Sequence, residues 1–175
     1  MTDDINKENR DMKWAIWLQS RPWFKGEEVK LGKQIGEEKK MAKVFMGGTC
    51  GESVWRQDLV RMLKPGVGYF DPVVEDWNEE AMKNEIKARE TYEYVLYWIT
   101  PEIRGVYSIA EVVDDSNKRP HKTLFGFEVD SCTTPGLKLD IQLVKSLTAV
   151  GKMVELNGGR WFRQLFEVAE YLNKQ

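Results

Sequence analysis

Residues 94–113 read YVLYWITPEIRGVYSIAEVV and contain two contrasting patterns. The first six residues are all aromatic or aliphatic, which is typical of a short buried strand. After a turn that contains Pro101 and Gly105, apolar residues recur at helical spacing. We therefore expect a strand over 94–99 and a helix over 108–116, joined as one strand–helix unit.

The same alternation continues on both sides of this unit, from Met41 to the C-terminal end. Short β-branched or aromatic runs are followed by longer amphipathic segments, a pattern typical of strands and helices built around a parallel sheet. The other expected strands cover 43–46, 67–70, 123–127 and 152–156. The other expected helices cover 53–63, 79–91, 139–150 and 160–173. The sequence thus predicts an α/β domain over residues 41–175 with a five-stranded parallel sheet.

Residues 1–40 differ in texture from this domain. They combine a polar start and a charged stretch with four aromatic residues, Trp14, Trp17, Trp23 and Phe24. An apolar cluster of this kind is unfavourable when it is exposed alone. We interpret residues 1–40 as an N-terminal appendage or linker whose aromatic part docks on the main domain or on a partner.

Composition excludes several function classes. Hydrophobic residues make up 42% of the chain and charged residues 31%, with a formal net charge of −2, so the sequence favours a soluble globular protein. A duplex-binding protein needs a basic excess, and because Lys and Arg are balanced by Asp and Glu we expect no nucleic acid duplex as a partner. No apolar run approaches the roughly 18 residues of a membrane span. We expect a cytoplasmic protein with no membrane partner.

The cysteine and histidine content gives no sign of a metal site. Cys50 and Cys132 lie far apart in the sequence and belong to no metal-ligand spacing. His121 has no second histidine with which to share a metal, and we interpret it as a surface or strand-end residue. A nucleophilic role for Cys50 would need a nearby histidine to activate the thiol. We therefore expect neither a metal nor an organic cofactor.

Parallel sheets bind ligands at the carboxyl ends of their strands, where the strand order reverses. The segments that follow each strand are therefore the candidate binding segments. After the first expected strand, Gly47, Gly48 and Thr49 begin a glycine-rich turn that leads into a helix. Such a turn lets the backbone approach a phosphate or a sugar hydroxyl closely. A simple tight turn between strand and helix explains the same residues equally well.

The segment after the second expected strand adds carboxylates and an indole at the same sheet edge. Trp77 is suited to stacking on a nucleobase, and Asp71 and Asp76 are suited to binding hydroxyl groups or a ring nitrogen. In the alternative interpretation, Asp76 or Asn78 caps the next helix and Trp77 is a core residue. The sequence leaves both interpretations open.

The segment after the third expected strand carries the main catalytic candidate. Ser108 and Glu111 match a capping box, in which the serine caps the helix and the glutamate bonds back to the serine N–H. Alternatively, Glu111 is a nucleophile, because a carboxylate beneath an anomeric carbon stabilises an oxocarbenium-like state and then bonds to that carbon. Cleavage also needs an acid for the departing base, and Glu85 and Glu102 are the candidates.

Four motifs, taken in order, resemble the nucleoside 2-deoxyribosyltransferase-like family, which is found in bacteria and their phages. They are VFMGGTC at 44–50, YFDPVVEDW at 69–77, YVLYWITPE at 94–102 and GVYSIAEVVD at 105–114. The resemblance covers about residues 42–172. It implies a flavodoxin-like three-layer sandwich that forms a homo-oligomer.

The resemblance also carries expectations for single residues. It implies that Glu111 is the nucleophile and that the glycine turn is the sugar-binding loop. Asn84-Glu85 is similar to an asparagine–acid pair of the family's transferases, which makes Glu85 a candidate acid. The chain departs from the family where an aspartate is expected shortly before the nucleophile, because Arg104 and Gly105 stand there with only Glu102 nearby. Arg104 is either a phosphate ligand, as suits a nucleotide-hydrolysing branch, or a solvated surface charge.

The expected function is cleavage or transfer at the N-glycosidic bond of a (deoxy)nucleoside or nucleotide. Glu111 would form a glycosyl-enzyme intermediate, and water or a second base would then accept the sugar. The alternative is a non-catalytic protein that binds a nucleotide or a partner and retains the fold. That alternative is motivated by the missing aspartate and by the aromatic residues Trp14 and Trp17.

Overall fold

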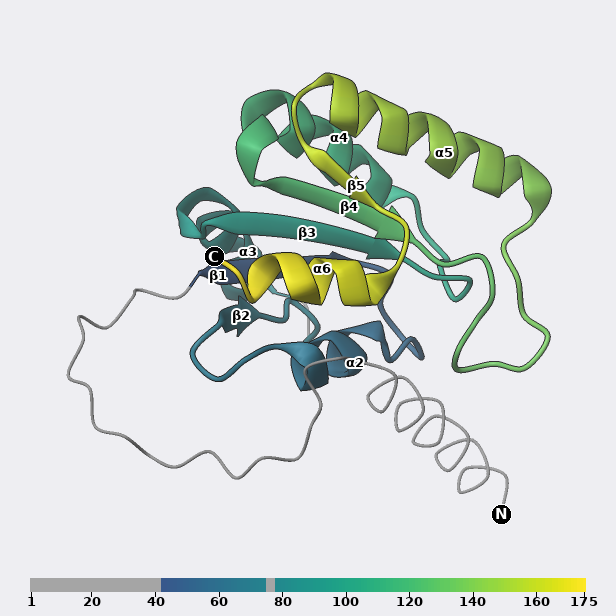
Figure 1. The fold of residues 1–175 in the computed structure, drawn as a ribbon, viewed down its shortest axis with the longest axis horizontal. Helices are drawn as coiled ribbons and strands as arrows, with labels where there is room; N and C mark the ends of the chain where they lie inside the picture. The colour runs from purple at the N-terminus through teal and green to yellow at the C-terminus, as the bar shows by residue number, and fades with distance from the viewer. Residues whose placement is uncertain (1–41, 75–77) are drawn as a thin grey trace, which may run out of the picture. The chain divides into compact units, whose positions relative to one another are not determined.

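Five strands form one parallel sheet in the part of the chain that the computed structural model describes, residues 42–74 and 78–175 (Figure 1). They are β1 (Lys43–Gly48), β2 (Gly68–Phe70), β3 (Tyr94–Ile99), β4 (Thr123–Phe127) and β5 (Arg160–Phe162). Their order across the sheet is β2-β1-β3-β4-β5, and every neighbouring pair is parallel. The predicted flavodoxin-like sheet is thereby confirmed.

The helices cover both faces of this sheet and complete three layers. They are α2 (Trp55–Met62), α3 (Glu79–Thr91), α4 (Tyr107–Lys118), α5 (Ile141–Leu156) and α6 (Leu165–Leu172), with a short 3₁₀ turn at Pro120–Lys122. Figure 1 shows α2 and α6 on one side of the sheet and α4 and α5 on the other. The apolar side chains of α3, through Ala88, join the core beneath α4 and α5.

Burial on both faces explains why β3 reads as an uninterrupted apolar run. Leu96 and Trp98 point into the core that α2 and α6 cover. Val95, Tyr97 and Ile99 point into the opposite core. All five side chains are fully buried, so β3 is the central strand that both cores share.

Helix starts follow the capping chemistry of the sequence. The side-chain oxygen of Asn78 accepts a hydrogen bond from the Ala81 N–H at 3.0 Å, so Asn78 caps α3. Asp140 caps α5 in the same way. The other proposed cap, Asp76, and its neighbour Trp77 lie outside the described residues.

The predicted strand over 152–156 is wrong, because these residues are the last turns of α5. Val154 is fully buried on the sheet-facing side of that helix. A side chain at Gly151 would clash with the Trp161 ring at 2.3 Å, which shows how closely α5 packs on β5. Gly158, with φ +97°, then reverses the chain. The fifth strand is therefore β5, and the last helix begins at Leu165 instead of Arg160.

The predicted appendage, residues 1–40, lies outside the described residues and stays a prediction. Among the residues that are described, no helix is long and apolar enough to cross a membrane.

Candidate active site

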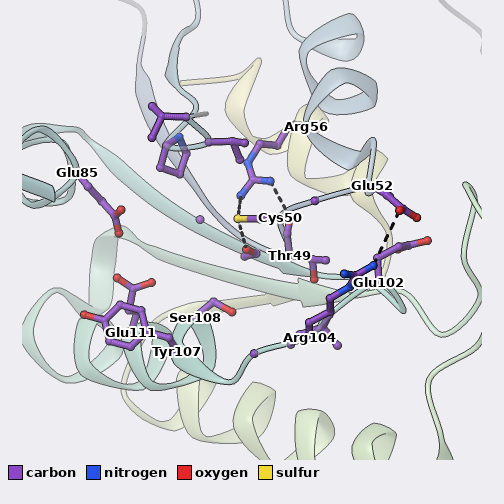
Figure 2. A pocket seen from close by; sticks show the side chains of 18 of the residues that line it. Thr49, Cys50, Glu52, Arg56, Glu85, Glu102, Arg104, Tyr107, Ser108 and Glu111 are labelled. Atoms are coloured by element: carbon purple, nitrogen blue, oxygen red, sulfur yellow. Dashed lines mark hydrogen bonds and ion pairs between the residues drawn. The ribbon is translucent and has the colours of Figure 1, made fainter. Parts of the chain in front are cut away.

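A cavity of about 570 Å³ opens at the carboxyl ends of β1 and β3. The strand order reverses between these two strands, which is where sheets of this topology bind ligands. Eight of the predicted site residues line the cavity (Figure 2): Gly47, Gly48, Thr49, Glu85, Glu102, Arg104, Ser108 and Glu111. The sequence-based choice of strand ends as binding segments is thus consistent with the geometry.

The remaining predicted residues are not among those that line the cavity. Asp71 forms an ion pair with Arg56, with 3.3 Å between Oδ1 and Nε, and accepts a hydrogen bond from the Val73 N–H at 3.0 Å. It therefore joins two residues that do line the cavity, Arg56 and Val73. Asp76 and Trp77 fall outside the described residues.

The glycine turn after β1 has a conformation that only glycine tolerates. Gly48 has φ +118°, and a Cβ there would lie 2.1 Å from the Trp98 carbonyl oxygen. The Thr49 N–H donates to that same oxygen at 2.9 Å, and the Thr49 hydroxyl accepts from the Thr100 N–H at 2.9 Å. The turn is therefore fixed against the end of β3.

Arg56 of α2 holds this turn from the other side, a role that the sequence analysis missed. Its Nε donates to the Met46 carbonyl oxygen at 2.9 Å, and its Nη1 donates to the Thr49 carbonyl oxygen at 2.7 Å. The side chain is buried, and this burial lowers the pKa of Arg56. An arginine in the first turn of a helix after a glycine loop is a common surface pattern, so the sequence carried no distinct signal for it.

The capping box, the alternative interpretation of Ser108 and Glu111, is absent. Helix α4 begins at Tyr107, its N-cap is Val106, and no side chain caps it. The Glu111 carboxylate instead accepts a hydrogen bond from Arg89 Nη1 at 2.7 Å. Glu111 is 8% exposed and lines the cavity. Its side chain is therefore directed to the site and takes no part in its own helix end.

Glu85 and Glu111 face each other across one end of the cavity (Figure 2). Glu85 lies on α3 and Glu111 lies on α4, and the two carboxyl groups are close enough for Glu85 to raise the pKa of Glu111. Burial raises the pKa of Glu111 to about 8; Arg89 opposes this, and the hydrogen bond and charge of Glu85 add to it. Glu111 therefore retains its proton at neutral pH.

Glu102 lies apart from this pair. One of its carboxylate oxygens accepts from the Thr100 hydroxyl at 2.5 Å, and the other accepts from the Ser131 hydroxyl. Arg104 is nearby at the cavity rim, with its side chain 88% exposed and Nη2 at 3.9 Å from Glu52. Of the two candidate acids, the structure brings Glu85 and not Glu102 to Glu111.

Behind Glu111 lies a buried network that the sequence analysis also missed. Arg89 bonds both Glu111 and Asp115, and the Tyr97 hydroxyl donates to Asp115 at 2.7 Å. A signal for it existed in the spacing. Glu85 and Arg89 are four residues apart on α3, and Glu111 and Asp115 are four apart on α4, so each pair shares a helix face.

The cysteines and the histidine contribute little to this arrangement. Cys50 is exposed at the cavity, where its thiol lies 3.4 Å from the Gly48 carbonyl oxygen. His121 is exposed on the 3₁₀ turn, as expected of a surface histidine. Within residues 42–74 and 78–175, no cluster of three His, Cys, Asp or Glu side chains has a geometry that suits a metal ion.

Comparison with known proteins bears on the same region. Residues 41–125 match the model of a family described as nucleoside 2-deoxyribosyltransferase like. The matched segment runs from β1 into β4, so it carries every residue that lines the cavity. The match suggests a nucleoside as the bound molecule and a glycosyl transfer as the reaction. A search of curated proteins gives no match.

Proposed function

We propose that this chain is an enzyme that cleaves or transfers at the N-glycosidic bond of a (deoxy)nucleoside or nucleotide, with Glu111 as the nucleophile. The observation that carries the proposal is the buried Glu85–Glu111 pair in the cavity at the ends of β1 and β3. The family match over residues 41–125 supports the substrate class.

The chemistry follows from two carboxyl groups in different protonation states. The proton that Glu111 holds at rest first passes to Glu85; Glu111, now a carboxylate, attacks C1′ of the sugar, the C1′–N bond breaks, and the proton passes from Glu85 to the departing base. A glycosyl ester on Glu111 results. An incoming water or base then attacks C1′, the ester bond breaks, and the proton of the acceptor passes to Glu85.

The closeness of the two carboxyl groups favours this covalent route. An inverting mechanism needs roughly 6.5 to 9.5 Å between the carboxyl groups to admit a water molecule. Glu85 and Glu111 line one end of the same cavity and are close enough for Glu85 to raise the pKa of Glu111, which leaves little room for such a water between them. The pair therefore suits a nucleophile and an acid that act on the same face of the sugar.

The walls of the cavity suit the other parts of a nucleoside. The glycine turn, Gly47, Gly48 and Thr49, is proposed to hold the sugar, with Ser108 nearby in the cavity wall. Apolar side chains suited to the base line the same cavity: Phe45, Pro72, Val73, Val74 and Tyr107. Arg104 at the rim is proposed to meet a 5′-phosphate when the substrate is a nucleotide. A volume of about 570 Å³ lies within the usual range for sites that enclose small molecules.

The test is base release by Glu111→Ala and Glu111→Gln proteins from a panel of deoxynucleosides and deoxynucleotides. We expect both to lose on the order of 1,000-fold or more in turnover, because no covalent intermediate can form. Glu79→Gln, on the exposed side of α3, is the matched control and keeps the wild-type rate. A wild-type rate in Glu111→Ala refutes the assignment.

A second measurement separates transfer from hydrolysis. When the wild-type protein is incubated with a deoxynucleoside and a different free base, a transferase yields the exchanged nucleoside and a hydrolase yields free sugar. Mass spectrometry of the quenched protein is expected to find the sugar on the peptide that contains Glu111. Sugar found on another residue would contradict the proposed nucleophile.

We also propose that the protein is a homo-oligomer. Large apolar side chains are exposed beside the cavity at the start of α4, where Val106 is 76% exposed and Tyr107 is 73% exposed. Met82 and Ile86 of α3 are exposed as well. A second copy of this chain would bury such side chains. Light scattering after size-exclusion chromatography tests this, and a monomer at micromolar concentration contradicts it.

A further inference from the structure

Arg89 occupies a position between the Glu111 carboxylate and a second, fully buried carboxylate. Its Nη1 donates to Glu111 Oε1 at 2.7 Å. Its Nε and Nη2 donate to the two oxygens of Asp115 at 3.0 and 3.1 Å. Arg89 belongs to α3, and three of its nitrogens thus donate hydrogen bonds to two carboxylates of one other helix, α4.

Asp115 fixes this guanidinium from behind. Its side chain is 0% exposed, and besides Arg89 it accepts from the Tyr97 hydroxyl at 2.7 Å and from Arg119. A carboxylate held by three donors has no freedom to follow a moving partner. The bidentate contact therefore keeps the Arg89 fork in one orientation.

We propose that Arg89 is a positioning residue for the nucleophile: clamped by Asp115, it binds Oε1 of Glu111 and so fixes the orientation of the carboxylate that attacks the sugar. The inference rests on the proposed function of Glu111. It adds to that function a chain of hydrogen bonds that runs from Tyr97 of β3 through Asp115 and Arg89 to Glu111.

The electrostatics of the site agree with this role. The groups that face Glu111 are Glu85 and Arg89 from α3, Asp115 from α4 and Tyr97 from β3. Burial, Glu85 and Asp115 all raise the pKa of Glu111, and the positive charge of Arg89 lowers it. Among these groups Arg89 supplies the positive charge that favours the attacking carboxylate form.

A purely structural role is the competing explanation, because Arg89 also ties α3 to α4. Removing Arg89 alone leaves Asp115 buried with fewer donors and destabilises the fold under either explanation. The double variant Arg89→Met with Asp115→Asn removes both charges and relieves that penalty. It is expected to restore stability, because Arg119, the other charged partner of Asp115, is partly exposed and can be solvated, but it leaves Glu111 without its donor.

The activity test compares Arg89→Met, Arg89→Lys and the double variant at temperatures where each is folded. We expect Arg89→Met to lower kcat on the order of 100-fold, because a misplaced nucleophile loses the aligned geometry of attack. The double variant is expected to recover its melting temperature but not its kcat. Arg89→Lys keeps the charge and is expected to recover part of kcat. Lys83→Met, which removes an exposed charge from the same helix, is the control.

A second readout does not depend on turnover. Carbon-13 NMR titration of the glutamate carboxyl groups, assigned with Glu111→Gln, measures the pKa of Glu111 in each variant. Arg89→Met and the double variant are expected to raise it by about one unit or more, and Arg89→Lys by less. Lys83→Met is expected to leave it unchanged.

The outcomes distinguish this inference from the proposed function. A raised pKa of Glu111 in a protein without base-release activity supports the contact and sinks only the proposed function. If the double variant regains both stability and full kcat, or if the pKa of Glu111 does not move in Arg89→Met, the positioning role is overturned.

Discussion

Two buried arginines support the two halves of the candidate site, and they do so in different ways. Arg56 donates to backbone carbonyl oxygens at Met46 and Thr49 and holds the glycine turn. Arg89 donates to the carboxylates of Glu111 and Asp115 and holds the proposed nucleophile. One arginine therefore fixes the shape of a loop, whereas the other fixes both the place and the charge of a side chain.

The pKa shifts of the two arginines reflect this difference. Burial lowers the pKa of Arg56, since the nearby groups Cys50, Asp71 and Glu85 compensate only in part. Burial also acts against the charge of Arg89, but the hydrogen bonds and charges of Asp115 and Glu111 outweigh it and raise the pKa of Arg89. Loss of Arg56 should therefore disturb binding and stability, while loss of Arg89 should disturb the protonation of Glu111.

The largest effect on stability is expected from Arg56→Met. It leaves the Met46 carbonyl without its side-chain donor and Asp71 without its ion pair, which should cost about 3 kcal/mol in the free energy of unfolding. We expect KM to rise about tenfold with a smaller change in kcat, because the turn is loosened and the nucleophile is not. Urea denaturation and steady-state kinetics measure both.

The pH profile makes the contrast sharper. The mechanism needs one proton on the Glu85–Glu111 pair, so kcat/KM should have a falling limb near the Glu111 pKa of about 8. Arg56→Met should leave that limb in place, and Arg89→Met should move it to higher pH. A limb that moves equally in both variants would show that the two arginines do not have separate roles.

An intermediate effect is expected from Glu111→Gln on stability. The folded-state pKa of Glu111, about 8, lies above the ordinary glutamate value of 4.5, so the folded protein binds an extra proton between these values. Wild-type stability from this group is therefore full below about pH 4.5 and is lost as the pH rises through 8. Glutamine does not titrate, so Glu111→Gln should become more stable than the wild type by at least about 1 kcal/mol at pH 9.

Thermal unfolding at pH 5 and pH 9 measures this difference. The melting temperatures of the two proteins should be similar at pH 5 and should separate by about 2 °C or more at pH 9. Arg56→Met shows no such crossover, because it changes no carboxyl group of the pair. Equal pH dependence in wild type and Glu111→Gln would mean that Glu111 is ionised throughout.

The elements of the sheet were predictable where burial made the pattern uniform. Strands β3 and β4 begin and end at the predicted residues because both faces of the sheet are covered there. The edge strand β5 is three residues long and has only Trp161 buried, so it carries no strand pattern of its own. The apolar residues within 152–156 led to the strand prediction. The buried positions of this segment and the residues before it, Leu147, Gly151 and Val154, have helical spacing instead.

Most of the site residues predicted from the sequence line the cavity, but the two arginines that support them, Arg56 and Arg89, were not predicted. Gly48 and Glu111 follow strands that the sequence identifies, so their convergence could be inferred from the topology rule for parallel sheets. Arg89 lies in the last turns of α3, far from any strand end, and its partner Asp115 is one helical turn beyond Glu111. Contacts between two helices depend on how they pack, which periodicity alone does not specify.

The smallest effect is expected from Glu102→Gln, and it tests which acid accompanies Glu111. Both oxygens of Glu102 already accept hydroxyl hydrogen bonds, from Thr100 and Ser131. An amide keeps one acceptor and loses a charge, so stability should fall by about 1 kcal/mol and base release by no more than a few-fold.

Glu85→Gln, by contrast, removes the acid beside Glu111 and should lower kcat by about 100-fold or more for poor leaving bases. Because substrates with an easily displaced base need less protonation, the Glu85→Gln defect should shrink for them, while the Glu102→Gln defect should stay small for every substrate. If the two defects are reversed, Glu102 is the acid, and the hydrogen bonds seen at its carboxylate belong to a resting arrangement that the substrate displaces.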